Sequence, residues 1–105
     1  MRKDMQELSN MRVLDKIEEF NAQEISGEWK KFRNCSAEVL STEKYHILRS
    51  YNTIVALIDI EENICYDFLR YVYGFTSTSS QHIAKFRYDY LNYRKPSTTF
   101  TYYPI

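Results

Sequence analysis

Two apolar stretches in the middle of the chain, residues 45–60 and 63–73, have the composition of β-strands. Both are rich in β-branched and aromatic residues, which fit a pleated and partly buried surface. The residues between them, 60–63, predict a tight reversal, because Asn63 tolerates the left-handed conformation that such turns require. The pattern therefore predicts a long antiparallel β-hairpin.

The first predicted strand is apolar on both of its faces. Ile54, Ala56 and Ile58 share one face. Val55 and Leu57 share the other. This pattern is typical of a central strand covered on both sides, or of a strand covered by a helix on one side and by a partner on the other.

A helix is predicted over residues 79–93. Thr78 and Gln81 have the spacing of a capping box at its start, and Pro96 stops the helix. Four residues at helical spacing form its expected buried stripe: Ile83, Phe86, Tyr90 and Tyr93. Four others are expected to point away from it: His82, Lys85, Asp89 and Asn92. We expect this helix to pack on the sheet.

Residues 1–34 are predicted to be helical. Six apolar residues form or flank a stripe there: Met5, Leu8, Val13, Leu14, Ile17 and Phe20. Asn10 would cap a fresh turn, so the pattern fits either one helix or two. Gly27 then interrupts the pattern, and a second, short helix would carry Trp29 and Phe32 on one face.

These elements predict one α+β domain, as the length of 105 residues also indicates. Its parts are a helical N-terminal part (1–34), a hairpin and helix core (45–93) and a tail (96–105). Residues 34–44 connect the first two parts, with a turn at the end of the connection. The tail has strand composition and predicts an edge strand. Its residues 100–103 would offer an unpaired apolar edge, through which two copies would form a homodimer.

The charges are balanced overall but unevenly distributed. With 14 basic and 14 acidic residues, the net charge gives no argument for nonspecific binding to nucleic acid or membrane. Residues 15–28 hold one lysine and five acidic residues: Asp15, Glu18, Glu19, Glu24 and Glu28. Residues 85–95 hold one aspartate and four cations: Lys85, Arg87, Arg94 and Lys95. The two segments pair or face water in the simplest interpretation, and form functional faces in the other.

The cysteines and the hydropathy pattern predict a cytoplasmic protein. Cys35 and Cys65 form no C-x-x-C motif and are expected to be free thiols in a reducing compartment. The first residues lack the apolar segment of a signal peptide, and no apolar run approaches the roughly 18 residues of a membrane span. We therefore expect no membrane partner.

The sequence offers no catalytic motif. His46 and His82 fall in different predicted elements and share no motif with a nucleophile. Asp59 and Asp67 would approach each other across the hairpin, but no third metal ligand accompanies them. We predict no enzymatic activity, no catalytic residue, no metal site and no cofactor.

The tyrosines indicate a binding surface instead. The chain has ten tyrosines, more than a domain of this size can bury, and tyrosine often anchors protein interfaces. The predicted partner-binding tyrosines are Tyr66, Tyr71, Tyr73, Tyr102 and Tyr103. Cations and rings together also predict an alternative nucleic-acid-binding set, which comprises Lys85, Arg87, Tyr88, Arg94 and Lys95.

Two segments of the core carry a resemblance to a group of proteins. The first is Ser-Tyr-Asn-Thr at residues 50–53, and the second is Tyr-Gly-Phe-Thr at 73–76, followed by His-Ile-Ala-Lys-Phe at 82–86. They resemble small proteins encoded by bacteriophages and related mobile elements, in which a Ser-Tyr-Asn-Thr strand precedes a Tyr-Gly-Tyr-Ser/Thr turn and a His-Ile-x-x-Phe helix. The resemblance covers residues 46–90. Some small phage proteins of this size are anti-CRISPR or other anti-defence inhibitors, which implies such a role in the cytoplasm of a bacterial host cell.

We therefore expect a non-enzymatic inhibitor that binds a host defence protein, with a CRISPR effector nuclease as the first candidate. The acidic segment 15–28 would then occupy a basic nucleic-acid channel of the partner. The alternative is a small regulator that binds DNA or RNA through residues 85–95.

Overall fold

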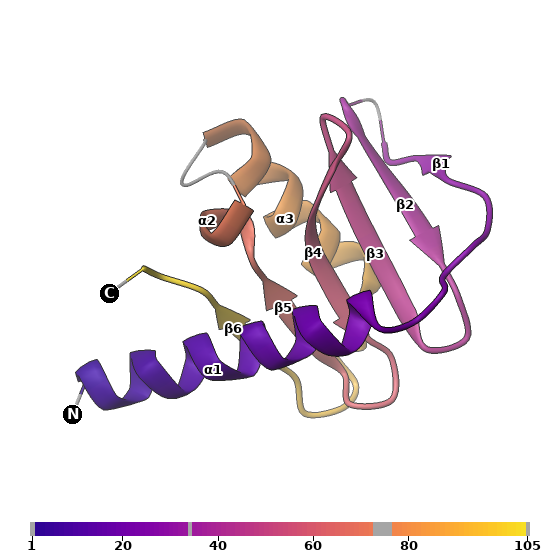
Figure 1. Cartoon of the computed structure of the whole chain (residues 1–105). Coiled ribbons are helices and arrows are strands. Elements are labelled where there is room, and N and C mark those ends of the chain that lie inside the picture. The colour runs from indigo at the N-terminus through magenta and orange to yellow at the C-terminus, as the bar shows by residue number, and fades with distance from the viewer. Residues whose placement is uncertain (1, 34, 73–76, 105) are drawn as a thin grey trace.

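A computed structural model describes residues 2–33, 35–72 and 77–104 of the chain. They form one mixed sheet and three helices, which confirms the predicted α+β class (Figure 1). The strands follow each other in chain order across the sheet; neighbours are antiparallel except β5 and β6, which are parallel. In chain order the elements are α1 (Arg2–Asn21), β1 (Lys30–Lys31), β2 (Ala37–Ser41), β3 (Tyr45–Ser50), β4 (Thr53–Asp59), β5 (Ile64–Asp67), α2 (Leu69–Val72), α3 (Ser77–Tyr90) and β6 (Thr98–Thr101).

Helices cover both faces of the sheet. Figure 1 shows α1 crossing in front of the sheet and α3 lying behind it. Val13 of α1 belongs to one core with Leu57, whereas Phe86 of α3 belongs to the other core with Ile58. All four side chains are at most 1% exposed. The prediction of a central strand covered on both sides is therefore confirmed for β4, and both covers come from this chain.

The predicted first strand is wrong in one respect, because residues 45–60 form two strands rather than one. β3 ends at Ser50, and the chain reverses through Tyr51 and Asn52, whose φ angles are 50° and 67°. Left-handed values at both central residues are the geometry of a two-residue hairpin turn. Asparagine adopts this geometry readily and tyrosine rarely does, so the sequence lacked the usual turn signal.

A β-bulge in β4 also changes the predicted alternation of faces. Leu48 pairs with Ala56. The next pair joins Arg49 to Ile54, which leaves Val55 as the extra residue. Val55 and Ala56 consequently both belong to the core on the α3 side, whereas Ile54 packs on the α1 side. The prediction that Ile54 and Ala56 share a face is therefore wrong.

The second predicted strand stops early. β5 ends at Asp67, and residues 69–72 form the short helix α2 instead of strand. The Asp67 carboxylate accepts a hydrogen bond from the Leu69 backbone N–H at 3.1 Å, which satisfies a free amide at the start of the helix. Tyr73, the last residue of the predicted strand and a predicted binding residue, lies outside the described residues.

The N-terminal part contains less helix than predicted. The expected second helix around Trp29 and Phe32 is wrong, because residues 30–31 form β1. Side chains three residues apart point to opposite faces of an extended chain. Trp29 accordingly packs on the α1 side of the sheet, and Phe32 is buried on the α3 side. The predicted connection 34–44 contains β2, and its expected turn joins β2 to β3.

The helix α3 begins two residues earlier and ends three residues earlier than predicted. Ile83 and Phe86 are buried, as predicted. Tyr93 lies beyond the helix and is 62% exposed, so its predicted place in the buried stripe is wrong. The expectation that His82 points away from the core is also wrong, because its side chain is buried.

The tail forms the predicted edge strand, β6, but the unpaired edge predicted for it is wrong. The side-chain amide of Asn10 accepts a hydrogen bond from the Tyr103 N–H at 2.9 Å and donates one to the Tyr103 carbonyl. Gln6 and Ser9 both donate to the Thr101 carbonyl. Polar side chains of α1 therefore hold the tail on the side that was expected to recruit a second copy.

Lys16 links α1 to the β4–β5 turn although its side chain is only 8% exposed. Its Nζ lies 3.1 Å from Asp59 and 3.4 Å from both Glu19 and Glu62, and 5.0 Å from the centre of the Tyr66 ring. Burial by itself lowers the pKa of Lys16, but the hydrogen bond to Asp59 and the surrounding negative charges raise it overall. The ammonium group therefore stays charged inside the fold.

The variant Lys16→Met tests this link. It keeps most of the side-chain volume but leaves the largely buried carboxylate of Asp59 without its cation, so we expect the free energy of unfolding to fall by about 3 kcal/mol in urea denaturation. The exposed Lys44 offers a matched control, and Lys44→Met should change it by less than about 0.5 kcal/mol. Equal losses in the two variants would contradict the role of Lys16.

Candidate functional site

The face of α1 that points away from the sheet is both apolar and acidic. We define this outer α1 face by seven exposed residues: Met5, Glu7, Leu8, Met11, Leu14, Asp15 and Glu18. Met5, Leu8 and Met11 are 72%, 58% and 60% exposed. The prediction that Met5 and Leu8 begin the buried stripe is therefore wrong. The side of α1 that faces the sheet carries two buried polar residues, Asn10 and Lys16.

A shallow hollow of about 400 Å³ borders the outer α1 face. Met11 and Leu14 line it from α1, and Tyr102 lines it from the tail. Glu7 lies at the same hollow. The structure thus joins one predicted binding tyrosine to apolar and acidic side chains of α1.

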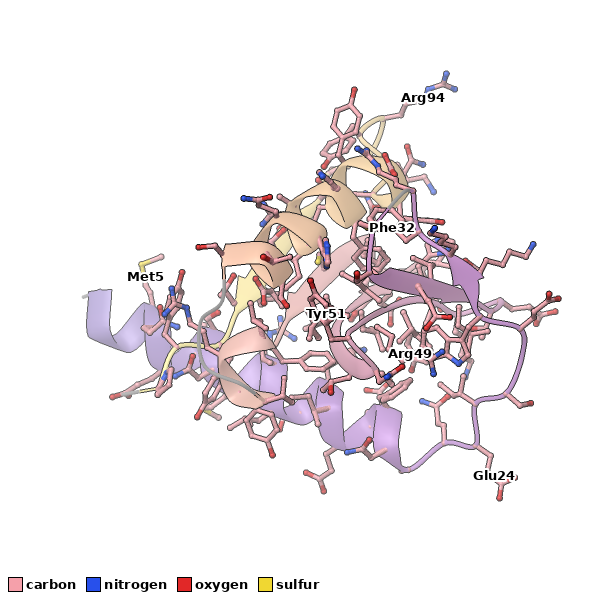
Figure 2. All side chains as sticks on the ribbon, turned by 90° about the horizontal axis from the view of Figure 1, so that it is seen from above. Met5, Glu24, Phe32, Arg49, Tyr51 and Arg94 are labelled. Atoms are coloured by element: carbon pink, nitrogen blue, oxygen red, sulfur yellow. The ribbon has the colours of Figure 1, made fainter. Side chains whose placement is uncertain are left out.

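The five predicted acidic residues do not form one surface. Asp15 and Glu18 lie on the outer α1 face. Glu19 instead binds Lys16 and accepts a hydrogen bond from the Tyr45 hydroxyl at 3.2 Å. The other two, Glu24 and Glu28, are exposed in the segment between α1 and β1. Figure 2 shows Glu24 and Met5 at opposite ends of the molecule.

The predicted tyrosines separate into one buried residue and a small cluster. Tyr66 is 2% exposed and donates its hydroxyl proton to Glu62, so its predicted role as a surface contact is wrong. The rings of Tyr71 and Tyr102 meet edge to face with 5.5 Å between centroids. The Tyr103 ring lies under the Arg70 guanidinium at 4.4 Å. The cluster therefore lies where α2 meets the tail.

Most of the predicted basic residues lie on another surface, at the C-terminal end of α3. Arg33 binds Asp89 of α3 with its Nε at 2.9 Å, which brings the end of β1 beside this helix. We call the exposed set the basic surface: Arg33, Lys85, Tyr88, Arg94 and Lys95. Figure 2 shows Arg94 at the same end of the molecule as Phe32. Arg33 was not among the predicted nucleic-acid-binding residues, because its place here depends on a contact between distant segments.

Arg87 faces another part of the molecule. Its side chain is half-buried and lines a pocket between α2, α3 and the tail, together with Asp67 and Arg70. The predicted nucleic-acid-binding set is therefore divided between two places.

A buried hydroxyl and imidazole cluster connects the β3–β4 turn to α3. The Ser50 hydroxyl lies 3.0 Å from His82 Nδ1 and 3.1 Å from the Ser79 hydroxyl. The Tyr51 ring lies 6.0 Å from the His82 ring. The β3–β4 turn and the first half of α3 thus pack against each other. Ser50 is 0% exposed, so this cluster fixes the turn to the helix and does not present a nucleophile to a substrate.

The described residues contain neither a cluster of metal ligands nor a helix that could span a membrane. They contain no group of three or more His, Cys, Asp and Glu side chains that could hold a metal ion. Asp59 and Asp67 do not meet across the sheet, because Asp59 pairs with Ile64 and Asp67 with Ala56. None of the helices in residues 2–33, 35–72 and 77–104 is long and apolar enough to cross a membrane.

The fold and these surfaces define a small α+β protein with a helix on each face of an open mixed sheet. Comparisons with protein-family models, curated proteins and solved structures find no match to the chain.

The pKa of His82 yields a prediction for pH dependence. Burial and, to a smaller degree, the charge of Lys85 lower this pKa. The folded state therefore resists protonation of His82 more than the unfolded state does, and its contribution to stability is complete above the ordinary pKa of about 6.5 and is lost as the pH falls below it.

Comparing the double variant His46→Gln/His82→Gln with the single variant His46→Gln isolates the contribution of His82, because neither protein contains His46. We expect the free energy of unfolding of His46→Gln to fall between pH 7.5 and 5.5, and that of the double variant to stay nearly constant. The measurement is urea denaturation at each pH. An identical pH profile for the two proteins would contradict the burial of a neutral His82.

Proposed function

We propose that this chain is a non-enzymatic binding protein that docks on a basic partner protein through the outer α1 face. The observation that carries the proposal is the exposure of Met5, Leu8 and Met11 on a helix whose other side is held by the sheet and the tail. Exposed apolar side chains at helical spacing, next to polar ones, are typical of helices that enter a groove on a partner. Methionine adapts well to such grooves.

The charges on the outer α1 face indicate the charge of the partner surface. Glu7, Asp15 and Glu18 are exposed and form no ion pair among the described residues. An acidic face steers association toward a basic surface and disfavours an acidic one. A nucleic-acid channel is such a basic surface, and an acidic helix in it would exclude the nucleic acid.

The resemblance to small phage proteins gives the proposal its biological setting. We infer a host defence protein as the partner, with a CRISPR effector nuclease as the first candidate, and inhibition by occupation of its nucleic-acid channel. The resemblance rests on residues 46–90, which hold the turn and the helix joined by Ser50 and His82 but not α1. The partner class and the docking helix are therefore supported by separate observations.

Charge reversal on the outer α1 face tests the proposal. We expect the wild-type chain to bind a purified effector nuclease and to inhibit DNA cleavage. Asp15→Lys/Glu18→Lys should weaken that binding about tenfold or more, because two attractive charges become repulsive. Calorimetric titration measures the affinity, and urea denaturation checks that stability is retained.

The variant Glu43→Lys/Glu61→Lys is the matched control, since it changes the net charge equally at two exposed turn residues outside this face. It should bind as the wild type does. Equal weakening in both double variants would show that net charge alone matters, and the absence of binding to every effector nuclease tested would overturn the partner class.

A second candidate function, binding of nucleic acid, is favoured by the ion pair between Arg33 and Asp89. This contact places the cation of Arg33 beside the C-terminal half of α3, next to the exposed ring of Tyr88. Cations that neutralise phosphates and rings that stack on bases are the usual components of a single-strand binding surface.

Replacing Lys95 separates this candidate from the first. If the basic surface binds single-stranded DNA or RNA, Lys95→Glu should lower the affinity similarly for all sequences and reduce the slope of log affinity against log salt by about one. Gel shifts of mixed oligonucleotides at several salt concentrations measure both quantities. Lys44→Glu, on the turn between β2 and β3, should leave them unchanged. No shift with the wild-type protein would remove this candidate.

A further inference from the structure

A partly enclosed polar pocket of about 230 Å³ lies between α2, α3 and the tail, and none of its lining residues belongs to either proposed binding surface. Asp67 lines it at the end of β5, Arg70 lines it from α2, and Ser80 and Arg87 line it from α3. Tyr103 lines it from the tail. This volume is below the roughly 300–1,000 Å³ of pockets that hold drug-sized ligands, so the pocket suits a small ion or one end of a larger molecule.

The two arginines differ in how firmly they are held. The Arg70 guanidinium stacks on the Tyr103 ring at 4.4 Å from its centroid. The Arg87 backbone carbonyl accepts a hydrogen bond from the Tyr93 hydroxyl, but the Arg87 guanidinium forms no hydrogen bond or ion pair with the described residues. A half-buried guanidinium that lines a pocket without a partner presents up to five N–H donors to a ligand.

Asp67 adds an acceptor to these donors. One of its oxygens accepts the Leu69 N–H, as described above, while burial raises the pKa of Asp67 and the nearby charges of Arg87 and Arg70 lower it. The pocket thus combines two guanidinium groups with one carboxylate, and its side chains carry a net charge of plus one. Arginine forks match the oxygens of a phosphate group, and a carboxylate accepts a hydrogen bond from a protonated one.

We propose that this pocket binds a protonated phosphoryl group, either as inorganic phosphate or as the end of a phosphomonoester. Arg87 and Arg70 bind its unprotonated oxygens, and Asp67 accepts the hydrogen bond from its P–OH group. Inorganic phosphate keeps at least one such proton throughout the neutral range, and a phosphomonoester keeps one in part of its population, because the second ionisation of a monoester lies at about pH 6. Sulfate carries no proton at neutral pH. One of its oxygens would therefore lie against the Asp67 carboxylate with no hydrogen bond to offset the repulsion between the two anions, so the pocket binds sulfate weakly.

Calorimetric titration of the full chain with inorganic phosphate, methyl phosphate and sulfate in chloride buffer at neutral pH tests this. We expect phosphate or methyl phosphate to bind at least about tenfold more tightly than sulfate, and the bound anion to raise the midpoint of thermal unfolding. Binding of phosphate identifies the free ion as sufficient, whereas binding of methyl phosphate alone identifies the phosphoryl end of a larger molecule.

Two variants assign the roles, and the structure predicts that both fold. Arg87→Gln removes a guanidinium without a partner among the described residues, and should weaken phosphate binding about tenfold or more. Asp67→Asn keeps an oxygen for the Leu69 N–H and should raise the affinity for sulfate toward that for phosphate. Lys44→Gln, at an exposed position between β2 and β3, removes one positive charge outside all the proposed sites and should bind as the wild type does.

Three results would overturn the proposal. The first is the absence of binding by both phosphate and methyl phosphate, and the second is equal affinity of the wild type for phosphate and sulfate. The third is equal weakening by Arg87→Gln and Lys44→Gln, which would assign the binding to net charge rather than to this pocket.

Discussion

The need to cover a sheet that is apolar on both faces determines the arrangement of this molecule. Leu57 and Ile58 of β4 point to opposite sides, and both are almost fully buried. Because exposed apolar surface on either face is unfavourable, each face requires a layer of its own. The chain supplies α1 on one side and α3 on the other.

The way in which α1 is attached explains what its outer face displays. A helix on a sheet usually buries its whole apolar stripe. Here Asn10 binds the main chain of the tail, and Lys16 binds a carboxylate of the β4–β5 turn, so polar contacts hold much of the buried side. Part of the apolar content of α1 is consequently left on the outside, at Met5, Leu8 and Met11. The same arrangement that fixes the helix therefore also makes the outer α1 face apolar and acidic.

The layers also explain how a chain of zero net charge can present surfaces of opposite sign. The outer α1 face is acidic, while the end of α3 with Arg33 beside it is basic. Arg33 and Asp89 join two of the basic segments, which lie 56 residues apart in the sequence. Between α2, α3 and the tail, Arg87 and Asp67 line a pocket that belongs to neither surface. Charge is therefore organised by layer and by the contacts between segments, and the net charge conceals this organisation.

The sequence alone determined the features that depend on neighbouring residues. These include the α+β class, the turn at Asn63 with its φ of 57°, the edge strand of the tail and the buried Ile83 and Phe86. Apolar periodicity and turn chemistry are properties of neighbouring residues, so they can be recognised without knowing which distant segments come into contact.

The tertiary structure alone decided the reversal at Tyr51, the burial of His82 against Ser50 and the outward position of Met5. It also decided which of the predicted cations form a common surface. Each of these depends on hydrogen bonds, ion pairs and packing between segments far apart in the chain. The free energy of such contacts cannot be inferred from the pattern of neighbouring residues.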